Sequence, residues 1–120
     1  MKNATLVIGA STNPNRYSNI AIKRLRDKEK ETLGLGLRTG KVLDVNIVTE
    51  KIQYPNIDTV TLYLNPERQE EYYDYIISLK PRRVIFNPGT ENPDFEKLLS
   101  KNNIKSEVAC TLVLLSIDEY

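Results

Sequence analysis

Short apolar runs rich in β-branched residues alternate along the chain with patterns of helical period. The first run covers residues 4–8, and the pattern over 18–30 places Ala21 and Leu25 on one face of a helix. Further strands are predicted by the runs at residues 32–37, 58–64, 83–86 and 105–109. This alternation of strand and helix is typical of βαβ units and of a mostly parallel sheet.

Two asparagine–proline pairs predict where later helices begin. Asn65 precedes Pro66 and Asn92 precedes Pro93, each ahead of a segment with an apolar helical stripe. An asparagine side chain accepts a hydrogen bond from the first turn of a helix, and proline suits the first helical position. Helices are therefore expected from both pairs, and a short helix or turn is expected after Thr111.

Residues 38–57 show no convincing helical period. We expect an irregular crossover there, with one or two short extended pieces around residues 42–48. The whole pattern predicts one α/β domain over residues 1–120. Its expected architecture is a three-layer, Rossmann-like, doubly wound and mostly parallel sheet of about five strands, with helices on both faces.

The turn after the first strand carries the residues that say most about function. Gly9 permits a tight turn and Ala10 keeps it narrow. Ser11 and Thr12 offer hydroxyls and backbone N–H groups to phosphate oxygens, and Arg16 adds a forked cationic donor. In an open parallel sheet, this turn is where a nucleotide diphosphate usually binds. An ordinary strand-to-helix loop with a surface arginine is the alternative.

The segment departs from the Gly-x-Gly-x-x-Gly pattern of dinucleotide-binding proteins. Ser11 stands at the second glycine position and Pro14 at the third. The second strand also lacks the carboxylate that usually holds the ribose 2′-hydroxyl of NAD, and Arg38 and Lys41 follow it instead. This pair suits a phosphate on the adenosine ribose, as in coenzyme A or NADP. A solvated pair on a mobile loop is the alternative.

Asparagine–proline pairs also follow the first and fourth predicted strands. The pairs beginning at Asn13 and Asn87 are predicted to form rigid loops that face a ligand, because proline restricts both its own backbone and the preceding residue. Ligands of open α/β sheets bind beyond the carboxyl ends of the strands. A single crevice there would bring both loops together.

The composition excludes several kinds of chemistry. The chain has no histidine and a single cysteine, Cys110. The common zinc sites, Ser-His-Asp triads, Cys-His pairs and internal disulfides therefore cannot form. We expect no metal site and find no recognisable catalytic constellation, which favours a binding protein over an enzyme.

The charge is almost balanced, with 17 basic and 16 acidic residues and a net charge of +1. No overall field attracts the chain to nucleic acid or to a membrane surface. The apolar runs are too short to span a bilayer, and no apolar signal region is seen. With its lone cysteine, the chain is expected to be a cytoplasmic protein that binds a small-molecule nucleotide; the sequence points to no protein partner.

Four motifs together carry a family resemblance. They are Gly-Ala-Ser-x-Asn-Pro-x-Arg-Tyr-Ser at 9–18, Tyr-Leu-Asn-Pro at 63–66, Asn-Pro-Gly-Thr-Glu-Asn at 87–92 and Ala-Cys-Thr-Leu-Val at 109–113. In this order they resemble the small bacterial, stand-alone coenzyme A-binding proteins of Rossmann type. Those proteins are similar to the CoA-binding domain of succinyl-CoA ligases and of ADP-forming acyl-CoA synthetases. The resemblance extends from about residue 4 to residue 115.

The resemblance implies that the chain binds coenzyme A or an acyl-CoA, and it assigns residues to each part of the ligand. The diphosphate loop would comprise Gly9, Ala10, Ser11, Asn13, Arg16, Tyr17 and Ser18. The adenosine and its 3′-phosphate would meet Gly36, Leu37 and Arg38. The floor of the crevice would comprise Tyr63, Leu64 and Asn65, and the pantetheine path would be bordered by Asn87, Pro88, Gly89 and Glu91. Ligase chemistry needs further domains and a phosphate-carrying histidine, so the resemblance implies binding without that chemistry.

Other interpretations stay open on the sequence alone. An NADP-dependent oxidoreductase would need an isolated residue such as Tyr63 or Glu91 as its proton donor. A protein-interaction module could have kept the fold and lost the ligand. Cys110 is interpreted as a small packing residue, and the alternative is a thiol that forms a mixed disulfide with coenzyme A.

Overall fold

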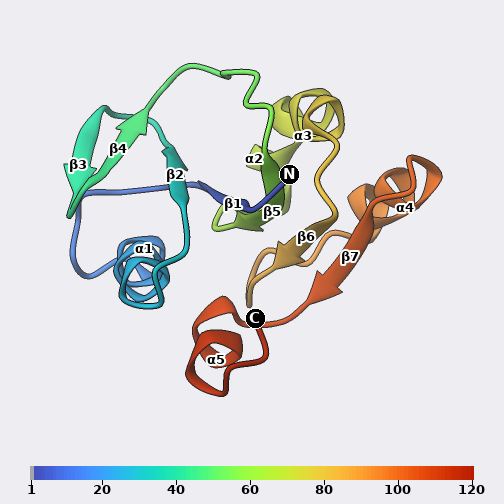
Figure 1. Ribbon diagram of the computed structural model, residues 1–120. Helices are drawn as coiled ribbons and strands as arrows, with labels where there is room; N and C mark the ends of the chain where they lie inside the picture. Colours follow the sequence, from blue (N-terminus) through green and yellow to red (C-terminus); the bar gives the residue numbers. More distant parts are fainter. Residues whose placement is uncertain (1) are drawn as a thin grey trace.

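The apolar runs and helical patterns become the elements of a seven-stranded sheet in the computed structural model, which describes residues 2–120. The elements are β1 (Ala4–Ile8), α1 (Tyr17–Asp27), β2 (Thr32–Leu35), β3 (Gly40–Val42), β4 (Val45–Val48), β5 (Ile57–Leu62), α2 (Pro66–Gln69), η1 (Glu70–Tyr72), α3 (Tyr73–Leu79), β6 (Arg83–Phe86), α4 (Pro93–Lys101), β7 (Lys105–Val108) and α5 (Thr111–Ser116). The strands lie in the order β3-β4-β2-β1-β5-β6-β7 (Figure 1). Every neighbouring pair is parallel except β3 with β4. The mostly parallel α/β sheet expected from the sequence is confirmed.

The expected number of about five strands is wrong, because the segment 38–57 contains a hairpin. Strands β3 and β4 form this hairpin, with Leu43 in the left-handed region at φ 53° between them, and β4 pairs in parallel with β2. Buried Val45 and Ile47 alternate with exposed Asn46 along β4. This alternation is too short to identify a strand by its period. β4 is instead stabilised by backbone hydrogen bonds to β2, a strand that the sequence pattern of this segment does not reveal as its neighbour.

The side chains of β1 divide the hydrophobic core into two clusters. Leu6 and Ile8 belong to a cluster that includes Ile76 of α3 and Phe95 of α4. Val7, which alternates with them, belongs to a second cluster with residues of α1 and α5. In Figure 1, α1 and α5 lie below the strands and α3 lies above them. Full burial of each of these side chains stabilises the fold by about 1.5–3 kcal/mol.

The predicted helix starts are confirmed, but the helix after Asn65 is divided. The Asn65 side chain accepts a hydrogen bond from the N–H of Arg68 at 3.0 Å, and Asn92 caps α4 in the same way at the N–H of Phe95. Beyond α2 the chain tightens into the 3-10 turn η1 before α3, which ends with Lys80 at φ 51°. No helix within residues 2–120 combines the length and the apolar character needed to cross a membrane.

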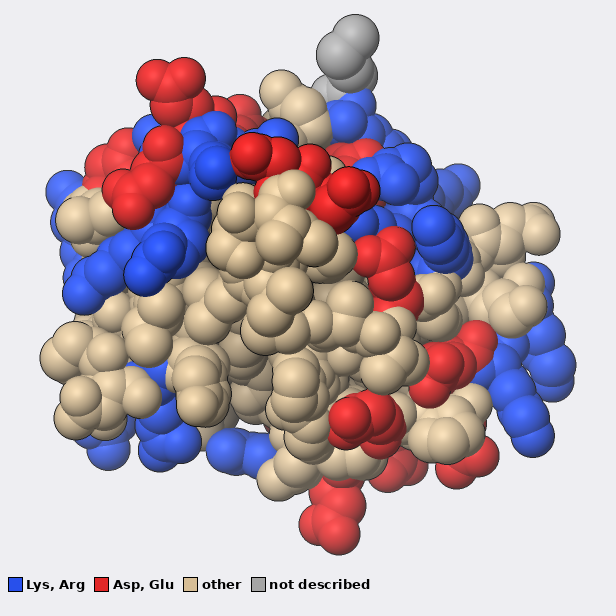
Figure 2. Space-filling model, turned by 90° about the horizontal axis from the view of Figure 1, so that it is seen from below, with Lys and Arg blue, Asp and Glu red and all other residues tan. Residues whose placement is uncertain are grey.

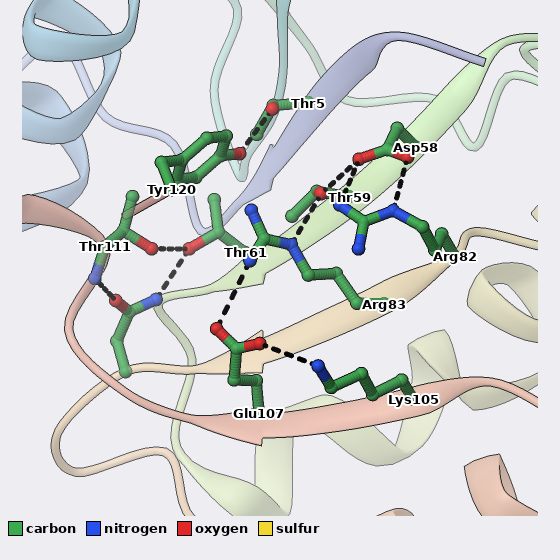
Figure 3. A network of polar contacts seen from close by, with 11 residues as sticks. Thr5, Asp58, Thr59, Thr61, Arg82, Arg83, Lys105, Glu107, Thr111 and Tyr120 are labelled. Carbon is green, nitrogen blue, oxygen red and sulfur yellow. Dashed lines mark hydrogen bonds and ion pairs between the residues drawn. The ribbon is translucent and has the colours of Figure 1, made fainter. Parts of the chain in front are cut away.

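A network of polar side chains joins the C-terminal segment to the sheet (Figure 3). Arg83 of β6 is buried, and its guanidinium donates to Thr59 Oγ1 at 3.0 Å and to Glu107 at 3.2 Å. The ring of Tyr120 lies 4.6 Å from this guanidinium, and its hydroxyl is hydrogen-bonded to Thr5. Buried polar groups need such partners to offset lost hydration. The network therefore holds α5 and the last residue against the strands.

Charges of both signs are interspersed on the side of the molecule that carries α1 and α5. Figure 2 shows basic and acidic side chains around a central area of other residues. Two ion pairs at the surface of the molecule are Arg26 with Asp44 at 2.9 Å and Lys28 with Asp118 at 2.8 Å. Exposed pairs of this kind contribute at most about 1 kcal/mol each. The near-neutral charge of the chain is thus reflected in a surface of mixed sign.

Gly9 and Gly89 both have a positive φ, but only Gly9 lies close to a neighbouring strand. Substitutions at the two positions therefore test how closely the end of β1 is packed. A Cβ on Gly9, at φ 92°, would lie 2.8 Å from the carbonyl oxygen of Tyr63, whereas one on Gly89, at φ 89°, would meet nothing within 4 Å. We expect Gly89→Ala to lower the free energy of unfolding by about 1–2 kcal/mol, from backbone strain alone. Gly9→Ala adds the displacement of a neighbouring backbone, and we expect about 2–5 kcal/mol. Urea denaturation measures both, and equal losses would contradict the close approach.

Candidate functional site

The loops after β1, β2, β5 and β6 enclose an open cleft of about 620 Å³. The carboxyl ends of these parallel strands meet at one edge of the sheet, which is where open α/β sheets bind ligands. The volume lies within the range of small-molecule sites. The cleft is lined by Gly9, Ala10, Ser11, Thr12, Asn13, Arg16, Tyr17, Ser18, Leu37, Arg38, Tyr63, Leu64, Asn65, Arg68, Pro88, Gly89 and Thr90.

The turn at Gly9 and Ala10 forms a tightly packed corner of the cleft. The N–H groups of both residues donate to the carbonyl oxygen of Leu35, at 2.9 and 3.0 Å. The N–H of Tyr63 donates to the carbonyl oxygen of Ile8 at 2.9 Å, which joins the β5 end to the β1 end. Gly9 and Ala10 therefore shape the cleft, and their N–H groups are already used within the fold.

The next residues hold their own loop in place. Ser11 Oγ accepts from the N–H of Asn13 at 3.1 Å, and Asn13 Oδ1 accepts from the N–H of Asn15 at 3.0 Å. The buried Asn19 of α1 donates from its side chain to the carbonyl oxygen of Ser11 at 2.9 Å. These local and helix-borne contacts fix the path of the chain from β1 to α1 before any ligand arrives.

The start of α1 presents backbone donors to the cleft. Arg16 is the N-cap residue, its side chain makes no capping bond, and the first turn contains no acidic residue. Within residues 2–120, no protein group accepts a hydrogen bond from the N–H groups of Ser11, Thr12, Tyr17 or Ser18. Free N–H groups and the positive end of the helix dipole together favour an anion.

Three arginines line the cleft without a partner. Within residues 2–120, Arg16, Arg38 and Arg68 form no ion pair, and no aspartate or glutamate lines the cleft. By contrast, Arg82 and Arg83, which lie outside the cleft, pair with Asp58 and Glu107. All the charged side chains that line the cleft are therefore positive, although the net charge of the chain is only +1.

Most of the residues predicted for the site line the cleft, and three of them lie outside its lining. Gly36 is buried, and a Cβ there would overlap the carbonyl group of Ala10. The Glu91 carboxylate accepts from the N–H of Gly89 at 2.8 Å and shapes the loop. The third, Asn87, is directed into the fold.

Asn87 connects three elements through one buried side chain. Its amide donates to Thr61 Oγ1 at 2.6 Å and to the carbonyl oxygen of Leu62 at 2.9 Å, and its oxygen accepts from the N–H of Thr111 at 2.9 Å. Thr61 and Thr111 also share a hydrogen bond of 2.8 Å, visible in Figure 3. The side chain thus fixes the ends of β5 and β6 against α5, and all its polar atoms are occupied.

Arg68 and Thr90 also line the cleft and were not among the residues predicted from the sequence. A signal for Arg68 exists, because the Asn65 cap predicts that the next three residues form a first helical turn at the end of a strand. Thr90 lies inside the fourth-strand loop, where only its neighbours were selected. Its hydroxyl donates to the carbonyl oxygen of Asn87 at 2.7 Å.

The side chain of Gln69 connects the loop after β5 to the loop after β6. It is fully buried, and its amide donates to the carbonyl oxygens of Leu64 at 2.9 Å and Thr90 at 2.8 Å. Its oxygen accepts from Asn92 at 2.9 Å, and Asn92 also donates to the Tyr73 hydroxyl at 2.8 Å. The loops after β5 and β6 are therefore held at a set separation.

Tyr63 lines the cleft, but its hydroxyl is buried. The hydroxyl lies near Thr61 and Thr111, yet within residues 2–120 no group is in hydrogen-bonding geometry with it. Burial raises the pKa of Tyr63 to about 12. The phenol is neutral at physiological pH and makes a poor proton donor for chemistry in the cleft.

Cys110 lies outside the lining of the cleft. It is half-buried and precedes α5. Among residues 2–120, no three His, Cys, Asp or Glu side chains are grouped so as to hold a metal ion.

Comparisons with known proteins give a family and a fold. A family model described as a CoA binding domain matches residues 3–116. A solved structure described as an uncharacterized protein has a TM-score of 0.95 and 45% identity, covering 100% of this chain and 99% of that one. A Thermus thermophilus protein (TM-score 0.86, 20% identity, 99% and 91% covered) and a Pyrococcus furiosus protein (0.80, 23%, 94% and 98%) share the fold. No curated protein matches the chain.

The role of Asn87 is tested by its removal. We expect Asn87→Ala to lower the free energy of unfolding by about 2–4 kcal/mol, because it leaves buried partners on β5 and α5 unsatisfied. The control is Asn65→Ala, which removes an exposed helix cap and should cost about 1 kcal/mol. Urea denaturation at neutral pH gives both values. A smaller loss for Asn87→Ala than for the control would contradict the structural role.

The raised pKa of Tyr63 predicts a pH dependence of stability. The folded state favours the neutral phenol, so its contribution is complete below pH 10 and is lost as the pH rises toward 12. Between pH 9 and pH 12, the native chain should lose about 2 kcal/mol more free energy of unfolding than the Tyr63→Phe variant. This difference corresponds to a pKa raised from 10.0 to about 12. Parallel pH profiles for the two proteins, measured by urea denaturation, would show that the phenol is not buried in solution.

Proposed function

Because the chain belongs to the family of CoA binding domains, we propose that its cleft binds coenzyme A or an acyl-CoA and holds it without chemistry of its own. The observation that carries this proposal is that, in the part of the chain that the structure describes, three arginines line the cleft without an ion-pair partner and no carboxylate lines it. Coenzyme A has a diphosphate and a 3′-phosphate on one end of the molecule. Arginine recognises phosphate through paired, charge-assisted hydrogen bonds.

The diphosphate is assigned to the start of α1. We interpret the sheet as a three-layer, doubly wound arrangement, in which the chain leaves β1 toward β2 on one side and β5 lies on the other. The crevice at such a reversal is the usual diphosphate position. Support comes from the free N–H groups of Tyr17 and Ser18 and from the adjacent Arg16.

The adenosine end is assigned to the loop after β2. Leu37 is 64% exposed and offers an apolar contact for the adenine ring, and the neighbouring Arg38 suits the 3′-phosphate. Among residues 2–120, no acidic side chain lines the cleft to hold the ribose 2′-hydroxyl of NAD. The pantetheine arm is assigned to the opposite side, along Leu64 and Pro88.

The absence of intrinsic catalysis is part of the proposal and rests on the lining residues. The cleft is lined by no carboxylate, no cysteine and no histidine among the described residues. Two tyrosines line the cleft: the Tyr63 phenol is buried and neutral, and Tyr17, at the start of α1, has an exposed side chain with no acidic or basic partner among the described residues. General acid–base work needs a titrating group within reach of the substrate. A holder or carrier of coenzyme A fits this set of side chains better than an oxidoreductase.

A thermal-shift panel tests the proposal. A ligand at about 100 times its Kd stabilises the folded state by about 2.7 kcal/mol, so coenzyme A should raise Tm by roughly 10 °C. Dephospho-coenzyme A, which lacks the 3′-phosphate, should raise Tm less, and NAD should have no effect. No shift with coenzyme A, or an equal shift with NAD, would overturn the proposal, and a larger shift with NADP would favour the oxidoreductase interpretation.

Arg38→Gln sharpens the assignment of the adenosine end. With this variant, coenzyme A and dephospho-coenzyme A should give the same shift, because the group that distinguishes them has lost its partner. The matched control is Arg24→Gln, which removes the same charge from an exposed position on α1 outside the cleft. The control should keep the difference between the two ligands. A difference that survives in Arg38→Gln would show that the 3′-phosphate binds elsewhere.

A further inference from the structure

The sheet ends at β7, and the outer edge of this strand carries unused backbone groups. β7 pairs only with β6, and within residues 2–120 no strand lies beyond it (Figure 1). The N–H groups of Lys105 and Ala109 donate to carbonyl oxygens on the β6 side, each at 3.2 Å. Backbone groups alternate in direction along a strand, so those of Ser106 and Val108 point away from the sheet. They are free to pair with another strand.

The charged side chains of β7 differ from those that usually protect an edge strand. Edge strands are commonly protected by lysine, which repels a second lysine. On β7, Lys105 and Glu107 lie on one face of the strand and have opposite signs. The Glu107 carboxylate is held in place, because it accepts from the buried Arg83 at 3.2 Å. The side chain of Lys105 is 65% exposed and lies 3.5 Å from the other carboxylate oxygen. The edge therefore carries one fixed negative charge and one flexible positive charge.

Antiparallel pairing of two copies about Ser106 matches both the backbone groups and the charges. In this register the two Ser106 residues lie opposite each other, and their outward N–H and C=O groups exchange two hydrogen bonds. Lys105 of each copy then lies opposite Glu107 of the other, which favours pairing. The exposed Val108 lies opposite Ile104 of the other copy, which is also apolar. An axis at Glu107 would instead place two carboxylates opposite each other.

The other edge of the sheet, formed by β3, does not offer this match. β3 has three residues, and the exposed Lys41 lies at its centre. An antiparallel pair of β3 strands about this residue would place two ammonium groups opposite each other, which disfavours pairing. The charge pattern therefore favours β7 as the edge that associates. No residue of β7 lines the cleft, so pairing there uses no cleft residue.

We propose that β7 is a self-association site, at which two copies of this chain pair antiparallel about a two-fold axis at Ser106. The sheet then continues from one copy into the other, and both copies contribute the same surface. The contact is small compared with the roughly 20–30 residues a side of a stable interface, so the dimer is weak. We expect a Kd of about 100 µM. The site is separate from the cleft and does not depend on which ligand the cleft binds.

Sedimentation equilibrium of the native chain, at concentrations below and above this Kd, should show a reversible monomer–dimer equilibrium. Lys105→Glu replaces two attractive cross-strand pairs with two repulsive ones, and we expect it to raise the Kd about tenfold. The matched control is Lys41→Glu, which makes the same charge change on the other edge strand and should leave the Kd unchanged. Both lysines are exposed, so urea denaturation should show that both variants are folded.

NMR spectra recorded over the same concentrations locate the contact. The amide signals of Ser106 and Val108 should shift as the dimer forms, and that of Lys41 should not. A chain that stays monomeric throughout overturns the proposal. So does a dimer that both variants weaken equally, that neither weakens, or whose shifts lie at β3, because it uses another surface. If the chain stays monomeric while Ser106 and Val108 respond to an added extended peptide of alternating valine and threonine, the edge binds a peptide and the self-association proposal fails. None of these outcomes bears on the binding of coenzyme A in the cleft.

Discussion

The close approach of three backbones at the carboxyl edge of the sheet is the constraint on which the site depends. The carbonyl oxygen of Leu35 accepts from the N–H groups of both Gly9 and Ala10, which joins the end of β2 to the turn after β1. A Cβ on Gly9 would collide with the Tyr63 carbonyl, and one on Gly36 would collide with that of Ala10. These strand ends lie close together, and the loops that follow them line one cleft.

Buried amide side chains then set the distances between the loops. Gln69 bonds the loop after β5 to the loop after β6, and Asn87 bonds the ends of both strands to the start of α5. A buried amide is costly unless all its polar atoms are paired. The polar atoms of these two side chains are therefore used within the fold.

Unlike the buried amides, the charged side chains of the cleft have no partner within the described fold. Arg16, Arg38 and Arg68 are exposed and lack partners among residues 2–120, so water solvates them until an anion binds. Their backbones are nonetheless fixed by caps, turns and buried neighbours. Fixing the donors in advance reduces the ordering cost of binding a flexible phosphorylated ligand. Phosphate recognition is the property that this arrangement supports.

The sequence alone was sufficient for the features that depend on neighbouring residues. Apolar runs identified the five strands β1, β2, β5, β6 and β7, and the Asn65 and Asn92 caps identified two helix starts. The loop from Gly9 to Ser18 was recognised from its residue types, and its lining of the cleft follows from where β1 ends.

Only the tertiary structure decided the features whose partners are distant along the chain. The sequence predicted short extended pieces around residues 42–48, but the hairpin of β3 and β4 and its pairing with β2 were visible only in the tertiary structure. Asn87 was expected to face the ligand, but its partners Thr61 and Thr111 lie 26 and 24 positions away and turn it inward. Arg68 joined the cleft because Gln69 holds α2 against a loop 21 positions further on. Local patterns predict elements and caps, whereas the use of each polar side chain depends on which distant groups the fold brings beside it.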